Sequence, residues 1–500
     1  MDLLKKLYRK EIKPDFDYFF LTAAVAVFTL LRIPSLFEPD WYGDEGIYQV
    51  IGRALVQGRV LYKGIWDNKP PMLYLYYALV NGDLFSIRLL SLLFGAGAVV
   101  TFYFVARTLF QKSKLSVMSS TGFFAVLFGL PLIEGNIANA ENFMLFPVLL
   151  SLLFIIRLNS KSKLLFPVFS GLLLSLSFLT KIVALFDFTA FLVILLGIRF
   201  YDKDFSAIKK QFFSKPKQFL VLIKQEIVLG IFFIVPILLV FLFFLVVGGV
   251  PDFLKAAFSQ NVGYVGYGNR FIIPQGLLIL KLGLLGIGVL AALLLRKRLG
   301  PSGLAVYIWL FFSLFDAFFS GRPYTHYVLV ALPAVSLLLG LACQKRVVSL
   351  FHGGMLVLAL VLLWNNFGYY KKIIPYYKNY IDFTFGNKTV QNYQKFFDGA
   401  TPRDYDIANF ITANTGPNEN VFLVTNSAQI YYLANKLPPG RYIVAYHMSF
   451  YNDAVTETEK ALQKAQPKFI ISTDDQVAKN FLDGYTLRYI VEGAKVYGHK

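Results

Sequence analysis

The sequence contains a single cysteine, Cys343, among 500 residues. One thiol cannot form an intramolecular disulfide, so the fold does not depend on a disulfide framework. Charged residues are also scarce, at 16% of the chain. A soluble protein of this length covers its surface with many more charges, and the scarcity therefore excludes an ordinary soluble globular protein.

Hydrophobic residues take the place of the missing charges, at 56% of the chain with 51 Phe and a mean hydropathy of +0.56. A bilayer core about 30 Å thick needs roughly 20 apolar residues for each helical span. Eleven segments come close to this length: 16–33, 87–107, 116–132, 140–157, 164–180, 182–200, 227–249, 275–295, 303–320, 324–342 and 347–366. They predict a polytopic, mainly α-helical membrane protein. The apolar segment 70–83 is shorter and predicts a helix that lies in the membrane interface.

Lys and Arg alternate between the loops that join these segments. Basic loops such as "ARTLFQKSK" and "RLNSKSK" fall on one side, and acidic or mixed loops such as "EPDWYGDE" and "EGNIANAEN" fall on the other. Cytoplasmic loops retain positive charge, so we expect a cytoplasmic N-terminus in the plasma (inner) membrane and an extracytoplasmic chain beyond about residue 367. The first apolar run is long and lacks a cleavage site, so we expect it to remain as a span. The net charge of +19 then reflects this bias, and we expect no nucleic-acid partner.

The last hundred residues change in character. Helical spacing in "RDYDIANFITANTG", "SAQIYYLAN" and "ETEKALQKA" alternates with strand-like "NVFLVT", "RYIVAY" and "KFIIST". This alternation predicts a small α/β domain with a parallel sheet at 401–500, after a Tyr- and Lys-rich interfacial connector at 367–400. The domain lacks a Gly-rich phosphate loop, which favours a lid or acceptor-docking role over a nucleotide site. The absence of internal repeats argues against a repeat-built transporter.

Several ionisable residues of the outer loops lie close to predicted span ends. They are Asp44, Glu45, Lys69, Glu141, Arg322 and His326. A charge at the centre of a membrane helix costs about 2.5–3.5 kcal/mol on insertion scales, and less near the interface, so we expect these groups to converge on one polar cavity. Two alternatives stay open: the loop charges could simply face water, and Lys181 at the end of "SFLTK" could snorkel to the interface.

A carboxylate and several cations at an outer membrane face suit glycosyl transfer from a polyprenyl-phosphate sugar. Nucleotide sugars are confined to the cytoplasm, so an extracytoplasmic transferase needs a lipid-linked donor. The carboxylate takes the proton of the acceptor hydroxyl, while a cation neutralises the departing phosphate. The sequence requires no cofactor, although a divalent metal could share the second task with Asp44 and Glu141 as its ligands.

Ordered motifs along residues 16–345 carry a resemblance to a known family. They are "GDEGIYQVIGRALVQGRVLYKGIWDNKPPMLYLYYAL", "SIRLLSLLFG", "NIANAENFMLFPVLLSL", "GLLLSLSFLTK" and "SGRPYTHYVLVALP". The chain resembles the bacterial branch of the dolichyl-phosphate-mannose protein mannosyltransferase family. That branch includes aminoarabinose transferases and rhizobial galacturonosyltransferases, and it has the glycosyltransferase-C fold. The first-loop Asp-Glu followed by Lys-Pro-Pro is the most specific part of the match.

The resemblance implies roles for the residues at matching positions. Asp44 is the first-loop acid that contacts the acceptor or acts as base, and Glu45 supports it. Glu141 is the second-loop acid that helps to shape the site. The group expected at the donor phosphate comprises Lys69, Lys181, Arg322, His326 and Tyr327. One departure is Asn68, which stands where aminoarabinose transferases have Glu before Lys-Pro-Pro, and it weighs against an aminoarabinose substrate but not against the reaction class.

Together these features predict a glycosyltransferase domain at 1–366 with a catalytic first outer loop at 34–86. The expected reaction moves a monosaccharide from a polyprenyl-phosphate donor to an extracytoplasmic protein, lipid or cell-surface glycan. Direct attack predicts inversion at the anomeric carbon. Two other functions remain open from the sequence: a transporter or flippase of a lipid-linked sugar, and a non-catalytic glycan-assembly protein of the same fold.

Overall fold

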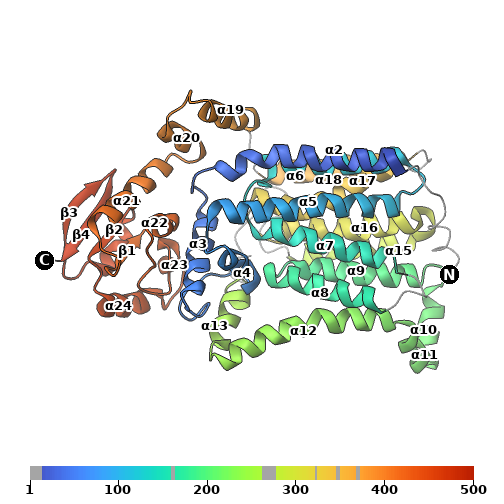
Figure 1. The fold of residues 1–500 in the computed structure, drawn as a ribbon. Coiled ribbons are helices and arrows are strands. Elements are labelled where there is room, and N and C mark those ends of the chain that lie inside the picture. Colours follow the sequence, from blue (N-terminus) through green and yellow to red (C-terminus); the bar gives the residue numbers. More distant parts are fainter. Residues whose placement is uncertain are drawn as a thin grey trace.

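A computed structural model describes residues 14–158, 164–261, 278–320, 322, 324–344, 349–367 and 372–499. The basic N-terminal "KKLYRKEIK" and the outer-loop segment "VGYVGYGNRF" lie outside the described residues, as do short parts of other predicted loops. The described chain forms a long helical bundle, a first loop at one end of it, and a C-terminal domain beyond that loop (Figure 1).

Each of the eleven apolar segments overlaps a helix of the bundle. These helices are α2 (Pro14–Arg32), α5 (Leu84–Leu109), α6 (Lys114–Gly129), α7 (Ala140–Ile156), α8 (Leu165–Thr180), α9 (Ala184–Arg199), α12 (Lys224–Val246), α15 (Leu278–Leu294), α16 (Arg296–Phe319), α17 (Val328–Ala342) and α18 (Ser349–Asn366). Six described segments are long and apolar enough to cross a membrane: Asp17–Phe37, Leu84–Leu109, Lys224–Val246, Arg296–Phe319, Thr325–Ala342 and Ser349–Asn366. The chain is thus a membrane protein, and the count of eleven spans stays a prediction.

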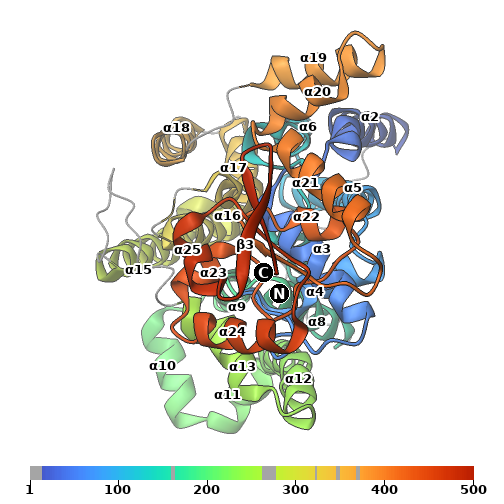
Figure 2. The same ribbon diagram turned by 90° about the vertical axis from the view of Figure 1, so that its left-hand side faces the viewer.

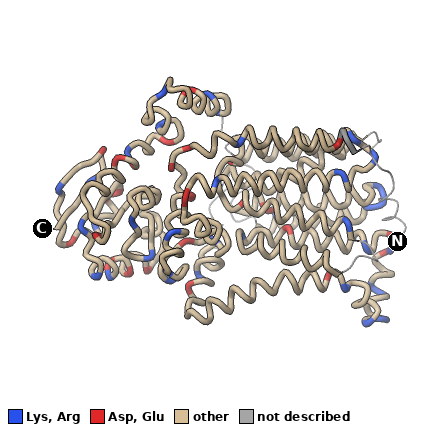
Figure 3. The backbone as a smooth tube through the Cα atoms, in the orientation of Figure 1, with Lys and Arg blue, Asp and Glu red and all other residues tan. Residues whose placement is uncertain are grey.

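Close packing of small and aromatic residues holds the bundle together. A Cβ atom at Gly171 of α8 would lie 2.5 Å from the carbonyl oxygen of Leu229, so only glycine lets α12 approach this closely. Phe102 and Phe124 stack with their ring centroids 4.5 Å apart between α5 and α6. At the end away from the C-terminal domain, α10 (Phe205–Ser214) and α11 (Pro216–Leu222) join α9 to α12. Lys and Arg gather at this same end (Figure 3).

The first loop folds into a compact layer between the bundle and the C-terminal domain. It contains η1 (Ile33–Phe37), α3 (Gly43–Val56) and α4 (Pro71–Leu79). The helix expected over 70–83 is therefore present, but it packs against α3: Tyr74 and Tyr77 are fully buried, and a Cβ at Gly52 would lie 2.7 Å from the carbonyl carbon of Tyr77. Its position relative to the bilayer surface stays a prediction.

Shorter elements join the bundle to this layer. After α12 come α13 (Val250–Leu254) and the π-helical turn η3 (Lys255–Ser259), and η4 (Thr325–Tyr327) precedes α17. The connector contains α19 (Ile373–Thr384) and α20 (Val390–Phe397). The turned view shows the C-terminal domain in front of the bundle end, with α3 and α4 beside it (Figure 2).

The C-terminal domain combines short helices with a four-stranded sheet of order β1-β2-β4-β3. Its elements are α21 (Thr401–Asn414), β1 (Val421–Val424), α22 (Gln429–Leu433), α23 (Ala445–Phe450), α24 (Ala454–Ala465), β2 (Phe469–Ser472), α25 (Asp475–Ala478), η5 (Lys479–Phe481), β3 (Tyr485–Val491) and β4 (Ala494–His499). Strands β1 and β2 are parallel, as expected, whereas β4 pairs antiparallel with both β2 and β3. The sheet is therefore mixed, and the expectation of a parallel sheet is corrected.

The strands of this domain differ from the prediction in two places. The segment "RYIVAY" is not a strand: its first residues are irregular and α23 begins at Ala445, because the Arg441 carbonyl accepts a hydrogen bond from Trp66 N at 2.9 Å and is held against the first loop. The β3–β4 hairpin was missed. Its turn residues Glu492 and Gly493 both have positive φ, which is the geometry of a two-residue type I′ turn.

Candidate active site

A cavity of about 610 Å³ lies where the bundle end, the first loop and α23 meet. Predicted site residues that line it are Asp44, Lys69, Glu141, Lys181, Arg322, His326 and Tyr327. Residues from loops separated by up to nearly 300 positions in the chain thus share one space. Glu45 is the exception among the predicted residues, since it does not line the cavity.

Asp44 reaches the cavity from the first turn of α3. A carboxylate is favoured there because the helix N-terminus carries a partial positive charge. Its Oδ2 accepts a hydrogen bond from the hydroxyl of Tyr48, one turn further along, at 3.2 Å. Burial, and then the charge of Asp44, raise the pKa of Tyr48 well above its usual value. Tyr48 therefore stays protonated and keeps one oxygen of Asp44 oriented.

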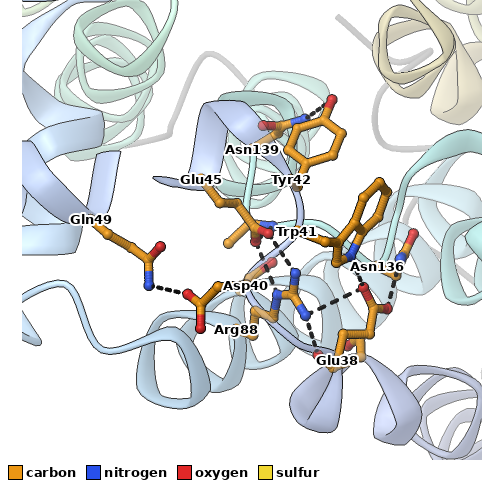
Figure 4. A network of polar contacts seen from close by, with 12 residues as sticks. Glu38, Asp40, Trp41, Tyr42, Glu45, Gln49, Arg88, Asn136 and Asn139 are labelled. Carbon is orange, nitrogen blue, oxygen red and sulfur yellow. Dashed lines mark hydrogen bonds and ion pairs between the residues drawn. The ribbon is translucent and has the colours of Figure 1, made fainter. Parts of the chain in front are cut away.

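Arg88, near the start of α5, forms a buried cluster with Glu38 and Glu45 that we call the Arg88 cluster (Figure 4). Its Nε and Nη2 donate to the two oxygens of Glu45 at 3.0 and 2.5 Å, and its Nη1 lies 3.3 Å from Oε2 of Glu38. The side chains of all three are at most 2% exposed. Such two-pronged contacts match the planar guanidinium and pair the buried charges.

Neutral donors use the remaining hydrogen-bonding capacity of the two carboxylates. Glu45 Oε1 also accepts from the backbone N–H of Ala138 at 2.8 Å. Glu38 accepts from three side chains: Trp41 at 2.8 Å, Asn136 at 2.9 Å and Tyr376 at 2.6 Å. The Arg88 cluster therefore ties the first loop to α5, to the loop before α7 and to α19.

The placement of Glu45 departs from its expected role beside Asp44. Consecutive residues of an α-helix point roughly 100° apart, so a helix that directs Asp44 into the cavity directs Glu45 toward the bundle. Glu45 meets Arg88 there (Figure 4). We therefore assign Glu45 to the stability of the loop.

The backbone of the Lys69 segment is held at both sides. Lys69 N donates to the hydroxyl of Tyr74 at 3.0 Å, and its carbonyl accepts from the hydroxyl of Tyr62 at 2.7 Å. Its Nζ donates to Oδ1 of Asn68 at 3.0 Å. The two prolines that follow have fixed φ angles and need no N–H partners, and α4 begins at Pro71. The Lys-Pro-Pro sequence thus presents the lysine at the cavity wall.

A carboxylate two residues earlier connects this segment to the C-terminal domain. Asp67 accepts from the Tyr74 hydroxyl at 2.7 Å, and its Oδ1 lies 3.6 Å from Nε2 of the fully buried His447 on α23. Burial raises the pKa of Asp67, but the His447 hydrogen bond, the Lys69 charge and the Tyr74 hydrogen bond together lower it below its usual value. Three other α23 residues, Tyr446, Ser449 and Phe450, line the cavity. The C-terminal domain is thus one wall of the site.

On the bundle side, Glu141, Lys181 and His326 form a second group of charges, which together with Asp44 we call the cavity cluster. Lys181 at the end of α8 forms an ion pair with Glu141 in the first turn of α7, and its Nζ lies 4.4 Å from the ring centre of Tyr327. Nε2 of His326 lies 3.7 Å from Oε1 of Glu141. Lys181 therefore does not snorkel away from the site. It is fixed beside a carboxylate and an aromatic face.

Some residues around the cavity were missed from the sequence. Glu134 holds His326 from behind, with Oε2 2.8 Å from Nδ1, and the Tyr42 hydroxyl donates to the same oxygen at 2.9 Å. Tyr42 and Asp316 line the cavity directly. Asp316 had a usable signal, because it is an isolated acid in the apolar run "FFSLFDAFF". For Glu134 the sequence gives no such signal beyond its place in an acidic loop.

Among the described residues, no group of three or more His, Cys, Asp or Glu side chains is placed so that it could hold a metal ion. Asp44 and Glu141, the suggested ligands, line the same cavity. Glu141 is already paired with Lys181. The donor set is therefore a weak fit for a divalent ion.

No protein-family model matches the chain, and no curated protein matches it in sequence. A solved structure of ArnT from Cupriavidus metallidurans bound to undecaprenyl phosphate is similar, with a TM-score of 0.53 and 13% identity over 97% of this chain and 98% of that one. The chain has the glycosyltransferase-C fold. The archaeal oligosaccharyltransferase AglB from Archaeoglobus fulgidus, solved with an inhibitory peptide and a dolichol-phosphate, aligns with a TM-score of 0.47 and 14% identity over 93% of this chain and 70% of that one. The fold shared with ArnT is the fold that the resemblance implied. Membership of the mannosyltransferase-like family stays a prediction.

Proposed function

We propose that this protein is a membrane glycosyltransferase that moves a monosaccharide from a polyprenyl-phosphate donor to an extracytoplasmic acceptor. The observation that carries the proposal is the cavity itself, in which Asp44 shares one space with Lys69, Lys181 and Arg322 at the end of a membrane bundle. A base for a hydroxyl and cations for a phosphate are the two requirements of the reaction. The undecaprenyl phosphate in the ArnT structure, whose fold this chain shares, supports a donor of this class.

The proposed step is a single displacement. The acceptor hydroxyl oxygen forms a bond to the anomeric carbon while the bond from that carbon to the phosphate oxygen breaks. Asp44 accepts the hydroxyl proton, and the bonding electrons leave with the lipid phosphate. Attack from the face opposite the leaving group inverts the anomeric centre. No covalent sugar–enzyme intermediate is required.

The cations of the cavity stabilise the leaving phosphate. Lys69 is held by its backbone contacts at one wall, and Lys181 is fixed against Tyr327 at another. Charges positioned in advance stabilise the transition state without reorganising during the reaction. His326, held through Glu134, adds a donor next to Glu141. Neutralised phosphate is a good leaving group, which is why we assign these residues to the donor.

We infer that the cavity faces the extracytoplasmic side of the plasma membrane. The support is the distribution of Lys and Arg, which gather at the bundle end away from the cavity (Figure 3). A reporter fused after residue 400 is expected to be active only outside the cytoplasm. A cytoplasmic reporter signal there would reverse the topology.

The decisive experiment begins with the donor. Mass spectrometry of lipid extracts from a deletion strain is expected to show an accumulated polyprenyl-phosphate sugar. This lipid, radiolabelled and given to the purified full-length protein with envelope fractions of the same strain, is expected to label the acceptor with the wild-type protein and not with Asp44→Asn.

Asp40→Asn is the matched control for Asp44→Asn. Asp40 lies in the same loop but pairs with Gln49 at 2.8 Å and with Tyr405 at 3.2 Å, away from the cavity lining. Its variant is expected to retain transfer. Movement of the intact lipid across vesicle membranes without transfer to any acceptor would instead support a flippase.

A further inference from the structure

A third carboxylate, Asp316, lines the cavity together with Asp44 and Glu141. It lies on α16, one turn before the helix ends at Phe319, and only 7% of the residue is exposed. Its neighbours in sequence, Phe315, Ala317 and Phe318, all have apolar side chains. An acid in such a segment is costly and is retained when it has a use.

Asp316 differs from the other buried acids in having no partner within the described part of the chain. Glu45 is paired with Arg88, and Glu141 with Lys181. Asp187 on the adjacent α9 accepts from the indole N–H of Trp309 at 2.8 Å. By contrast, no described group donates to Asp316. Because Asp316 lines the cavity, its hydrogen-bond donors come from whatever occupies that space, and a bound ligand with hydroxyl groups can replace water there.

The chemistry of the group restricts which part of a ligand it binds. The carboxyl oxygens of Asp316 accept hydrogen bonds, so they suit hydroxyl groups, which donate, better than phosphate oxygens, which mainly accept. The phosphate of a lipid-linked sugar is matched by the cations of the cavity, among them Lys69 and Lys181. The sugar ring is the part of that donor that carries several hydroxyl groups. The two carboxylate oxygens can accept from two neighbouring hydroxyls.

We propose that Asp316 binds hydroxyl groups of the sugar carried by the lipid phosphate and so helps to select the sugar. The inference rests on the proposed function, because it assumes a sugar-bearing lipid in this cavity. It adds a sugar-recognition residue on α16, separate from Asp44, which faces the acceptor hydroxyl, and from the cations, which face the phosphate.

Binding to lipids with and without a sugar tests the inference. The probes are undecaprenyl phosphate alone and a panel of undecaprenyl-phosphate hexoses and pentoses, measured by native mass spectrometry of the purified full-length protein. The wild-type protein is expected to prefer at least one sugar-bearing lipid over the bare lipid phosphate. Asp316→Asn is expected to reduce that preference about tenfold, the upper range for one hydrogen bond, and to leave the bare lipid unaffected.

Asp187→Asn provides the matched control, since Asp187 is equally buried in the bundle but does not line the cavity. Its variant is expected to keep the wild-type preference. Equal losses in both variants would mean that replacing any buried acid of the bundle lowers the preference for the sugar-bearing lipid. Contact between Asp316 and the sugar would then not be needed, and the inference would be overturned. An unchanged preference in Asp316→Asn would overturn it as well, while leaving the proposed transferase function intact.

Deoxy-sugar lipids keep the test independent of how well the variant folds. In the wild-type protein, removal of one particular ring hydroxyl is expected to abolish most of the preference. In Asp316→Asn the same removal is expected to have no further effect. A wild-type protein that binds bare lipid phosphate but prefers no sugar would overturn this inference alone. One that binds neither lipid would overturn the proposed donor and this inference together.

Discussion

The Arg88 cluster and the cavity cluster both combine acids with basic side chains near the same loop, yet they differ in access. In the Arg88 cluster, Glu38 and Glu45 are saturated by Arg88 and by neutral donors, and none of the three lines the cavity. In the cavity cluster, Asp44 has one hydrogen-bonded oxygen and opens to a space of about 610 Å³. Burial and charge are common to both clusters, so they do not separate them. Only the cavity cluster keeps hydrogen-bonding capacity that a ligand could use, and this is why we propose that it acts on the substrate.

The largest effect is expected for Asp44→Asn. Loss of a general base typically slows a reaction about 10²- to 10⁴-fold, or roughly 3–5 kcal/mol of barrier. We expect a loss in this range in the radiolabel assay with normal membrane abundance and thermal stability. Near wild-type transfer by the purified variant would place Asp44 with the structural cluster and break the comparison.

Arg88→Met tests the other side of the comparison. It leaves Glu38 and Glu45 buried without their cation, and breaking a buried ion pair by removing one partner costs about 3–5 kcal/mol. We expect low membrane abundance and a much lower unfolding temperature in detergent. Glu45→Gln is expected to cause a smaller loss of the same kind, with the activity of each folded molecule retained. Normal stability with lost activity in Glu45→Gln would restore the catalytic role expected for it.

Lys69→Ala is expected to weaken donor use about ten- to hundredfold, because it removes a charged contact to the phosphate. The measurement is kcat/KM at varied donor and fixed acceptor concentration, and then at varied acceptor and fixed donor concentration. Lys69→Arg is expected to recover part of the loss, since it keeps the charge but changes the geometry. An unchanged donor dependence would remove Lys69 from the site.

A smaller effect, about tenfold on the rate, is expected for Glu134→Gln. The variant removes the charge that holds His326 Nδ1, while His326 itself remains in the cavity. His326→Ala should lose more activity, and the double variant should lose no more than His326→Ala alone. Additive losses would show that Glu134 acts on the reaction through another group.

The smallest effect concerns pH and the contact between Asp67 and His447. The folded pKa of Asp67 is lowered below 3.8, so its ionised form stabilises the fold at neutral pH, and this contribution is lost as the pH falls through the folded pKa. The difference in unfolding temperature between wild type and Asp67→Asn should therefore be constant from about pH 5 to 8 and shrink in stronger acid. Burial raises the pKa of Asp40, so the corresponding difference for Asp40→Asn should instead fall as the pH rises through the acidic range. A single trend for both variants would contradict these assignments.

The helices of the bundle were predictable because long apolar runs have few alternatives in a membrane protein. The structure also brings the predicted site residues other than Glu45 to one cavity, because they lie close to helix ends at the same end of the bundle. Their roles stay predictions. The Arg88 cluster was not predictable. Arg88 reads as an ordinary flanking cation in "SIRLLSLL", and its partner Glu45 lies 43 positions away.

The wall formed by α23 escaped prediction for a different reason. The segment from Tyr442 to Val444 is apolar and β-branched enough to read as a strand, and only its contact with the first loop shows otherwise. Asp187 and Asp316 show the same limit of sequence-based prediction within the bundle. Both are single acids in apolar helices, and only their surroundings show that one has a protein partner while the other faces the cavity.

The contacts of the first loop also determine when the cavity is completed during synthesis. Chains are made from the N-terminus onward, so the loop with Asp44 and Lys69 is synthesised long before its distant partners exist. The contact of Glu38 with Tyr376 cannot form until Tyr376 has been made, and the contact of Asp67 needs His447, which is 380 positions later. Until the last fifth of the chain has been made, Asp67 therefore lacks the partner that it has in the complete protein. A protein truncated before α23 would accordingly insert its helices but expose the first loop to proteolysis.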